Sequence, residues 1–157
     1  MIRLDAMRSG TTVRGYDLYR ERDLLVTFTL SWARGRGSFQ WEGGRYDLYR
    51  ETPCFGDFVV SQGGRVIARA TKNSVFVNAF TVRSEDREFR FRAARPPSGR
   101  FVLEEHGWGT GEILPQTWFS PPSQGEFPDG FPIPVCVFLF WLAALIWRRQ
   151  ESFAGNG

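Results

Sequence analysis

The sequence predicts a mainly β protein, an antiparallel β-barrel of about 11–12 strands that encloses one hydrophobic C-terminal α-helix. Fifteen Phe, six Trp and seventeen Gly favour strands and tight turns over helices. Glycine and proline also divide the chain into short runs, a pattern typical of antiparallel sheets. Finally, residues 136–147 are apolar without interruption, and such a segment must be buried in an apolar environment, away from water.

Size and charge exclude several classes of function. The chain has 157 residues, enough for one domain, which we expect to span 1–149. A net charge of +3 is too small to indicate a nucleic-acid interface, so no nucleic-acid partner is expected. One His and two Cys cannot by themselves form a metal cage or a disulfide framework, so we expect no metal and no cofactor. The amino terminus lacks an apolar run of signal-peptide length, and a cytoplasmic location is expected.

Alternation and turn residues place the strands. The clearest strand is 87–94, where Phe89 and Phe91 alternate with Arg90 and Arg92, so that one face is apolar and the other solvated. Residues 57–71 predict a hairpin around Gly63-Gly64, because glycine adopts positive φ without strain. The other predicted strands, in chain order, are 16–20, 24–31, 38–41, 46–50, 75–83, 100–106 and 112–114.

The hexapeptide YDLYRE occurs twice, at 16–21 and at 46–51. Two copies are too few for a solenoid, which needs about three repeats to bury a continuous core. We interpret each copy as a strand with Tyr and Leu facing inward and Asp outward. The repeat therefore indicates internal pseudo-symmetry of the sheet rather than a binding motif.

Proline separates the strands from the last element. Residues 120–134 contain five prolines, which predicts an irregular linker over 120–133. A helix is predicted over 134–149, with Pro134 in the first turn and Arg148 and Arg149 at the negative end of the helix dipole. Residues 150–157 are predicted to be a disordered tail.

Ten large apolar side chains lie between 135 and 147, on all sides of the predicted helix. Leaving them in water would cost about 15–30 kcal/mol, more than the whole stability of a typical domain, about 5–15 kcal/mol. The predicted core of the helix consists of Val137, Phe138, Phe140, Trp141, Leu142 and Leu145. Because a helix over 134–147 is only about 21 Å long, against about 30 Å for a hydrocarbon layer, we expect it inside the barrel. The alternative is a short tail anchor with a cytoplasmic β domain that recruits a protein partner.

Residues 32–149 resemble an uncharacterised family of bacterial proteins. The resemblance rests on SWARGRGSF (31–39), GRYDLYR (44–50), GDFV (56–59), GGRVIARATK (63–72), RFVLEE (100–105), GEI (111–113) and, most specifically, FLFWLAALIWRR (138–149). Many strands followed by one apolar helix is also similar in architecture to the Tubby C-terminal and LURP-one-related superfamily, to which phospholipid scramblases are similar. This resemblance implies a barrel of about twelve strands around its last helix.

No segment predicts a catalytic centre, and we expect no enzyme activity. His106 beside Glu104 and Glu105 lacks a nucleophile, and GWGTG at 107–111 favours a glycine-rich hairpin turn over a phosphate loop. Cys136 is expected to be a small buried hydrophobe, and Cys54 follows Pro53 in a turn with no visible activating group.

The expected function is binding, of anionic phospholipid or of an acyl chain, by a monomer. The segment RGRG at 34–37 presents two guanidinium groups that suit a phosphate, although the residues favour a turn with solvated arginines. Between 101 and 147 there is no Lys or Arg, so the cations of the first hundred residues could form a basic side that faces lipid. The candidate contacts are Arg34, Arg36 and Lys72, the last being the one lysine of the sequence.

Overall fold

The computed structural model describes residues 1–9, 15–31, 33–52, 55–74, 77–94, 98–115 and 123–154. Within these ranges the chain forms twelve strands and one helix. The strands are β1 (Ile2–Arg8), β2 (Gly15–Arg20), β3 (Asp23–Thr29), β4 (Arg36–Trp41), β5 (Gly44–Arg50), β6 (Phe58–Gln62), β7 (Arg65–Lys72), β8 (Ala79–Ser84), β9 (Arg87–Ala93), β10 (Phe101–Glu105), β11 (Trp108–Leu114) and β12 (Ser123–Phe127), and the helix is α1 (Ile133–Ala154).

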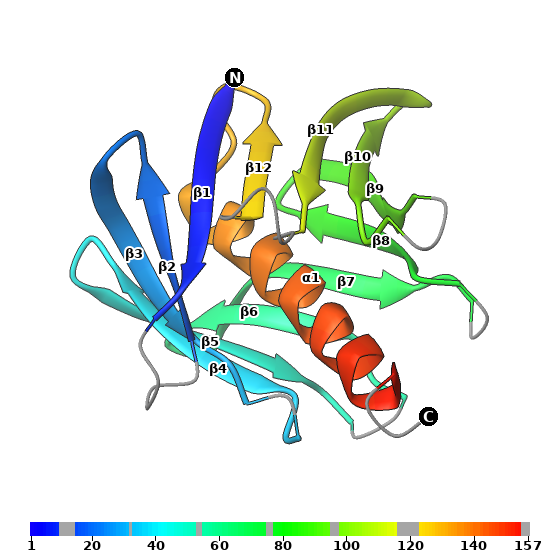
Figure 1. Cartoon of the computed structure of the whole chain (residues 1–157), viewed down its shortest axis with the longest axis horizontal. Coiled ribbons are helices and arrows are strands. Elements are labelled where there is room, and N and C mark those ends of the chain that lie inside the picture. Colours follow the sequence, from blue (N-terminus) through cyan, green and yellow to red (C-terminus); the bar gives the residue numbers. More distant parts are fainter. Residues whose placement is uncertain are drawn as a thin grey trace.

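The strands close into one antiparallel barrel (Figure 1). Each strand pairs with its neighbours in the sequence, and β12 returns to pair with β1 over five residues, with Leu4 opposite Gly125. Closure leaves no free sheet edge, which is the usual hazard of an antiparallel sheet. The predicted fold, a closed antiparallel barrel with one C-terminal helix, is confirmed.

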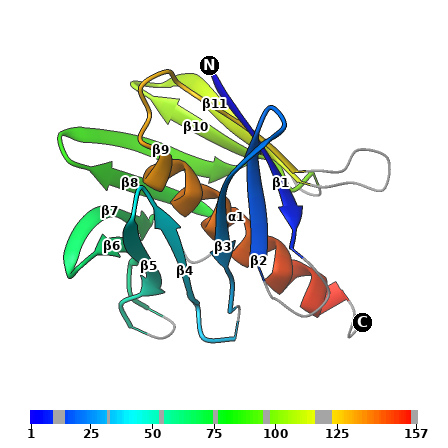
Figure 2. The ribbon, with the colours of Figure 1, turned by 90° about the vertical axis from the view of Figure 1, so that its left-hand side faces the viewer.

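Helix α1 runs through the middle of the barrel (Figure 2). Every residue from Val135 to Ile146 is buried, including all six predicted core residues. Trp141 is fully buried, with its ring 5.9 Å from that of Phe58. By length and composition the segment Ile133–Gln150 could cross a membrane, but 72% of it is buried within the barrel. The interior of the barrel therefore provides the apolar environment that buries this segment.

The two ends of the barrel differ. At the end where α1 begins, tight turns join β2 to β3, β4 to β5, β6 to β7, β8 to β9 and β10 to β11. Each turn starts with a residue of positive φ, as two-residue hairpins require; these residues are Glu21, Glu42, Gly63, Glu85 and His106. The Gly63-Gly64 hairpin is therefore confirmed. The remaining connections between strands are all longer and lie at the end where α1 finishes. The hydrogen bond from Trp147 Nε1 to the Gly99 carbonyl joins one of them to that part of the helix.

The two YDLYRE copies lie on β2 and β5 except for their final Glu, and the strand interpretation is confirmed. The inward position of tyrosine holds for the first Tyr of each copy, whereas Tyr49 in the second copy faces outward. Leu18 and Leu48 are buried, and each leading tyrosine stacks on a phenylalanine of the neighbouring strand, Tyr16 on Phe28 and Tyr46 on Phe39. The two phenylalanines are themselves paired between β3 and β4. The four rings thus form one row across β2, β3, β4 and β5, and the leading tyrosines of the two copies lie at its two ends.

Three sequence predictions need correction. Strand β1 was not expected, and β12 occupies part of the segment predicted as an irregular linker over 120–133. The inward residues of β12 include Ser123 and Gly125, which lack apolar bulk, because the wall runs close to α1: a Cβ at Gly125 would lie 2.6 Å from Phe140 Cζ. Helix α1 also continues to Ala154, where a disordered tail from 150 was predicted. Residues 155–157 lie outside the described residues.

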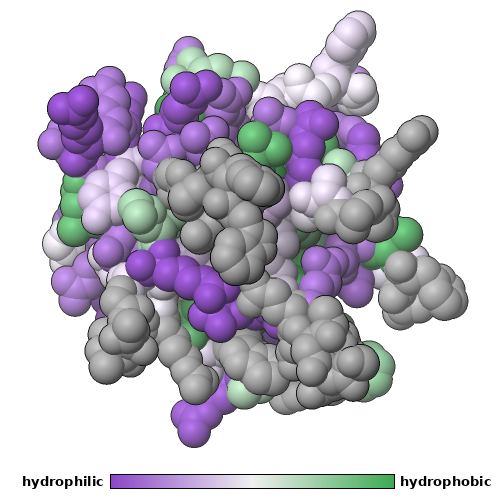
Figure 3. Space-filling model, viewed as in Figure 1, coloured by the Kyte–Doolittle hydropathy of each residue, from purple (hydrophilic) through white to green (hydrophobic). Residues whose placement is uncertain are grey.

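The described surface is polar where the core is apolar. On the face drawn in Figure 3, hydrophilic residues cover most of the coloured area and hydrophobic ones are scattered in small patches. On β9, Phe89 and Phe91 are buried while Arg90 is exposed, as the alternation predicts. The functional candidates must therefore be sought among polar side chains on the outside of the barrel.

Candidate anion-binding site

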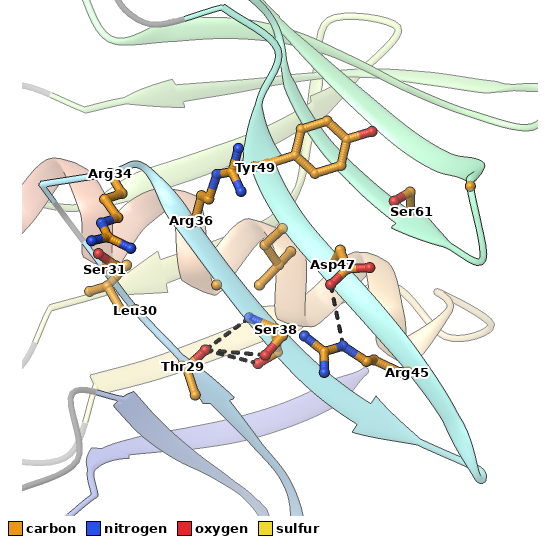
Figure 4. A pocket seen from close by; sticks show the side chains of 13 residues that line it. Thr29, Leu30, Ser31, Arg34, Arg36, Ser38, Arg45, Asp47, Tyr49 and Ser61 are labelled. Carbon is orange, nitrogen blue, oxygen red and sulfur yellow. Dashed lines mark hydrogen bonds and ion pairs between the residues drawn. The ribbon is translucent and has the colours of Figure 1, made fainter.

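A hollow of about 910 Å³ lies on the outer face of the barrel across β3, β4 and β5 (Figure 4). Alternation along β4 and β5 turns Arg36, Ser38, Arg45, Asp47 and Tyr49 outward, because their neighbours Phe39, Tyr46 and Leu48 face the core. The connection between β3 and β4 adds Ser31 and Arg34 to the lining. Polar groups from three successive strands therefore converge on one concave surface.

The hollow coincides with a weakened junction in the barrel wall. Strands β3 and β4 share the Cα pair Phe28–Phe39, and beyond it the Ser38 N–H donates to Thr29 Oγ1 at 2.9 Å. An isolated bridge between Ser31 and Arg36 closes the junction. A hydroxyl side chain thus replaces a main-chain acceptor at this point of the ladder.

Gly37 explains why the wall departs from regular pairing here. A Cβ at this position would lie 2.2 Å from the Thr29 carbonyl oxygen and 2.9 Å from Trp141 Nε1. Only glycine lets the indole pack against the inner side of β4. The Trp141 N–H is buried there and has no hydrogen-bond partner among the described residues. The packing of the central helix against Gly37 therefore affects the part of the barrel wall that lines the outer hollow.

Positive charge dominates the hollow. Arg34 and Arg36 are exposed, and neither forms an ion pair with a carboxylate of the described residues. Arg45 lies 3.4 Å from Asp47 through its Nε. Three guanidinium groups thus face one carboxylate, and guanidinium forks bind phosphate and carboxylate groups in bidentate geometry. The arrangement suits an anion with several oxygen atoms.

The predicted contacts do not all meet. The structure brings Arg34 and Arg36 to the hollow, whereas Lys72 lies at the end of β7, outside the lining. Partial burial lowers the pKa of Lys72, and the neighbouring positive charges of Arg50 and Arg149 lower it further. The hollow adds Arg45, Asp47 and Tyr49, which sequence reasoning missed. The one feature of the sequence that could have indicated them is their predicted outward position on the strand, where Asp47 and Tyr49 belong to the second YDLYRE copy and Arg45 precedes it.

The other candidates have structural roles. His106 opens the exposed turn between β10 and β11, and its carboxylate neighbours are engaged in ion pairs, Glu104 with Arg92 at 2.6 Å and Glu105 with Arg87 at 2.7 Å. The turn predicted at 107–111 is confined to His106 and Gly107, because Trp108 already starts β11.

Of the two cysteines, the structure describes Cys136, and this thiol is not placed to act as a nucleophile. Cys136 is buried in α1, as expected, and burial raises the pKa of its thiol far above the ordinary value. Cys54 lies outside the described residues. Among the described residues, no group of three or more His, Cys, Asp or Glu side chains is placed to hold a metal ion.

Fold and site together define a closed twelve-stranded barrel with an apolar helix in its core and a cationic hollow on its outer face. Comparisons of the chain with protein-family models, with curated proteins and with solved structures found no match. Its function must therefore be inferred from the geometry of the site.

Proposed function

We propose that this protein is a non-catalytic binding protein that takes the anionic headgroup of a phospholipid in the hollow across β3, β4 and β5. The observation that carries the proposal is the pair Arg34 and Arg36, two exposed guanidinium groups without a carboxylate partner among the described residues, on the lining of the hollow. A volume of about 910 Å³ falls in the range of small-molecule sites, about 300–1,000 Å³.

Hydroxyl groups complement the arginines. Thr29, Ser31 and Ser38 line the same hollow and offer hydrogen-bond donors to phosphate oxygens. The core around α1 is filled by closely packed side chains, many of them fully buried. A headgroup on the outer face therefore fits better than an acyl chain inside the barrel, which was the other ligand predicted from the sequence.

The barrel with a central helix is the architecture implied by the predicted resemblance to the Tubby C-terminal and LURP-one-related superfamily, and that resemblance stays a prediction. A monomeric, cytoplasmic protein is part of the same proposal. The tail-anchor alternative would require α1 to leave the barrel and expose Val135–Ile146 together with their partners in the wall. Burial of the helix favours the binding protein over the anchor.

The test is calorimetric titration with dihexanoyl phosphatidic acid, an anionic phospholipid used as a soluble monomer. We expect Arg34→Ala and Arg36→Ala each to weaken binding about tenfold, because a hydrogen bond to a charged group contributes about 1.5–3 kcal/mol. Arg90→Ala is the control, since it removes an exposed arginine from β9, outside the hollow. Equal effects of all three substitutions, or no binding by the wild type, would refute the proposal.

A further inference from the structure

The described charges divide unevenly between the two ends of the barrel. The tight turns at the end where α1 begins carry more acids than cations: Glu21, Asp23, Glu42, Glu85 and Asp86 against Arg22 and Arg65. The opposite end, which we call the loop end, carries cations: Arg34, Arg36, Lys72, Arg148 and Arg149. The meander produces this division, because every second connection lies at the same end.

The cations of the loop end are not neutralised by the acids described there. Glu51 and Asp57, which flank the β5–β6 connection, both form ion pairs with Arg69. Lys72 instead has Arg50 and Arg149 as its charged neighbours. Arg148 Nε is buried, and no described residue hydrogen-bonds to it. The loop end therefore presents an excess of positive charge to whatever it meets.

Two hydrophobic side chains project from the same end. Phe55, in the connection after β5, is 90% exposed, and Val77, in the connection after β7, is 55% exposed. Figure 1 shows β5 and β7, the strands that precede these connections, ending on the side of the barrel where α1 finishes. Single exposed apolar side chains are common. Apolar side chains among unneutralised cations, however, are the combination that binds the interface of an anionic membrane.

The hollow adjoins this end. Gly35, between the two arginines of the hollow, lies beside β5: a Cβ there would be 3.9 Å from Arg50 Cβ. Arg50 Nε donates to the Gly56 carbonyl at 2.9 Å, which ties the Phe55 connection to the same strand. Arg34 and Phe55 are thus held on neighbouring connections of the loop end.

We propose that the loop end docks end-on against an anionic lipid bilayer, with Phe55 and Val77 entering the headgroup layer and Lys72 and Arg149 facing anionic lipid. This inference rests on the proposed function and deepens it, because it names a bilayer as the source of the headgroup that Arg34 and Arg36 bind. The opposite end also exposes hydrophobic side chains, Trp108 at 78% and Leu24 at 58%. Its turns carry Arg22 and Arg65 among more numerous acids, so that end lacks the excess of positive charge that an anionic surface attracts.

The first test is cosedimentation of the full chain with phosphatidylcholine vesicles, with and without phosphatidylserine. Wild type is expected to bind the vesicles that contain phosphatidylserine more tightly and to be released by salt. Phe55→Ser should weaken that binding about tenfold, because an interfacial phenylalanine is lost. The matched control is Trp108→Ser, an equally drastic change of an exposed aromatic residue at the opposite end, which should bind like wild type.

The second test reverses a charge. Lys72→Glu should weaken binding to phosphatidylserine vesicles about tenfold, whereas Arg90→Glu, on the side of the barrel, should have a much smaller effect. Equal losses for Phe55→Ser and Trp108→Ser, or equal binding to both kinds of vesicle, would overturn end-on docking. If wild type still binds soluble dihexanoyl phosphatidic acid, only the docking proposal has failed. If it binds neither lipid form, the proposed function has failed with it.

Discussion

At the scale of single residues, this barrel is limited by the space between its wall and its central helix. Gly37 and Gly125 both face α1, and a Cβ at either position would collide with an aromatic side chain of the helix. At Gly37 the main chain of β3 is closer still, because the Cβ would lie 2.2 Å from the Thr29 carbonyl oxygen. Neither contact can relax cheaply, because Trp141 and Phe140 are held on all sides.

Gly37→Ala should therefore destabilise the protein by about 1–3 kcal/mol, the usual cost of overpacking. Gly109→Ala is the control: this glycine lies in β11, and a Cβ there would have nothing within 4 Å. We expect Gly109→Ala to be neutral or slightly stabilising, since alanine restricts the unfolded chain. Chemical denaturation of both variants checks the prediction, and equal stabilities would contradict it.

At the scale of elements, the tight turns determine how consecutive strands pair. Three of these turns place two consecutive residues at positive φ: Glu42-Gly43, Gly63-Gly64 and His106-Gly107. This geometry matches the twist of the flanking strands. His106, with φ of 52°, is among the residue types that tolerate the left-handed region. Its position at an exposed turn explains the single histidine of the chain without chemistry.

His106→Val should destabilise the protein by about 1–2 kcal/mol, because a β-branched side chain at positive φ is strained. His106→Asn should leave stability unchanged, since asparagine favours the same conformation. Thermal unfolding distinguishes the two substitutions. Identical melting of both variants would show that the turn does not require a left-handed residue, and loss of lipid binding in His106→Asn would show a role that the turn does not explain.

At the scale of the whole molecule, barrel and helix depend on each other. The wall contributes inward side chains from all twelve strands, and α1 fills the space that they surround. Without the helix, the inner faces of the strands would have no apolar partner. Without the barrel, the residues from Val135 to Ile146 would lie in water. The hydrophobic effect therefore makes the two parts one folding unit.

A chain ending at Gly130 tests this dependence. We expect it to aggregate when expressed without detergent, whereas the full chain is soluble and unfolds cooperatively, because removal of α1 leaves the interior of the barrel unfilled. Thermal unfolding and size-exclusion chromatography of both chains provide the measurement. A soluble, cooperatively folded truncation beside a membrane-bound full chain would show instead that the helix is an anchor.

The sequence alone determined those features that depend on local pattern. The alternation of Phe89 and Phe91 with arginines predicts strand β9. The pair Gly63-Gly64 predicts the hairpin that joins β6 and β7, and the apolar run predicts a buried helix from 134. Local pattern suffices there because side-chain direction in a strand or helix follows from its period. Strand β12 has no such pattern. Its inward Ser123 and Gly125 are small because α1 passes close by.

Only the tertiary structure decided which distant residues meet. Arg34 and Arg36 join Arg45 and Asp47 because β4 pairs with β5, while Lys72 is separated from them by its place on β7. The sequence shows many arginines and cannot show at which end of the barrel each lies. That assignment depends on strand order and closure, because in a closed meander alternate connections share one end. Arg34, Arg36, Lys72, Arg148 and Arg149 therefore share one end of the barrel, whereas Arg22 and Arg65 lie at the other.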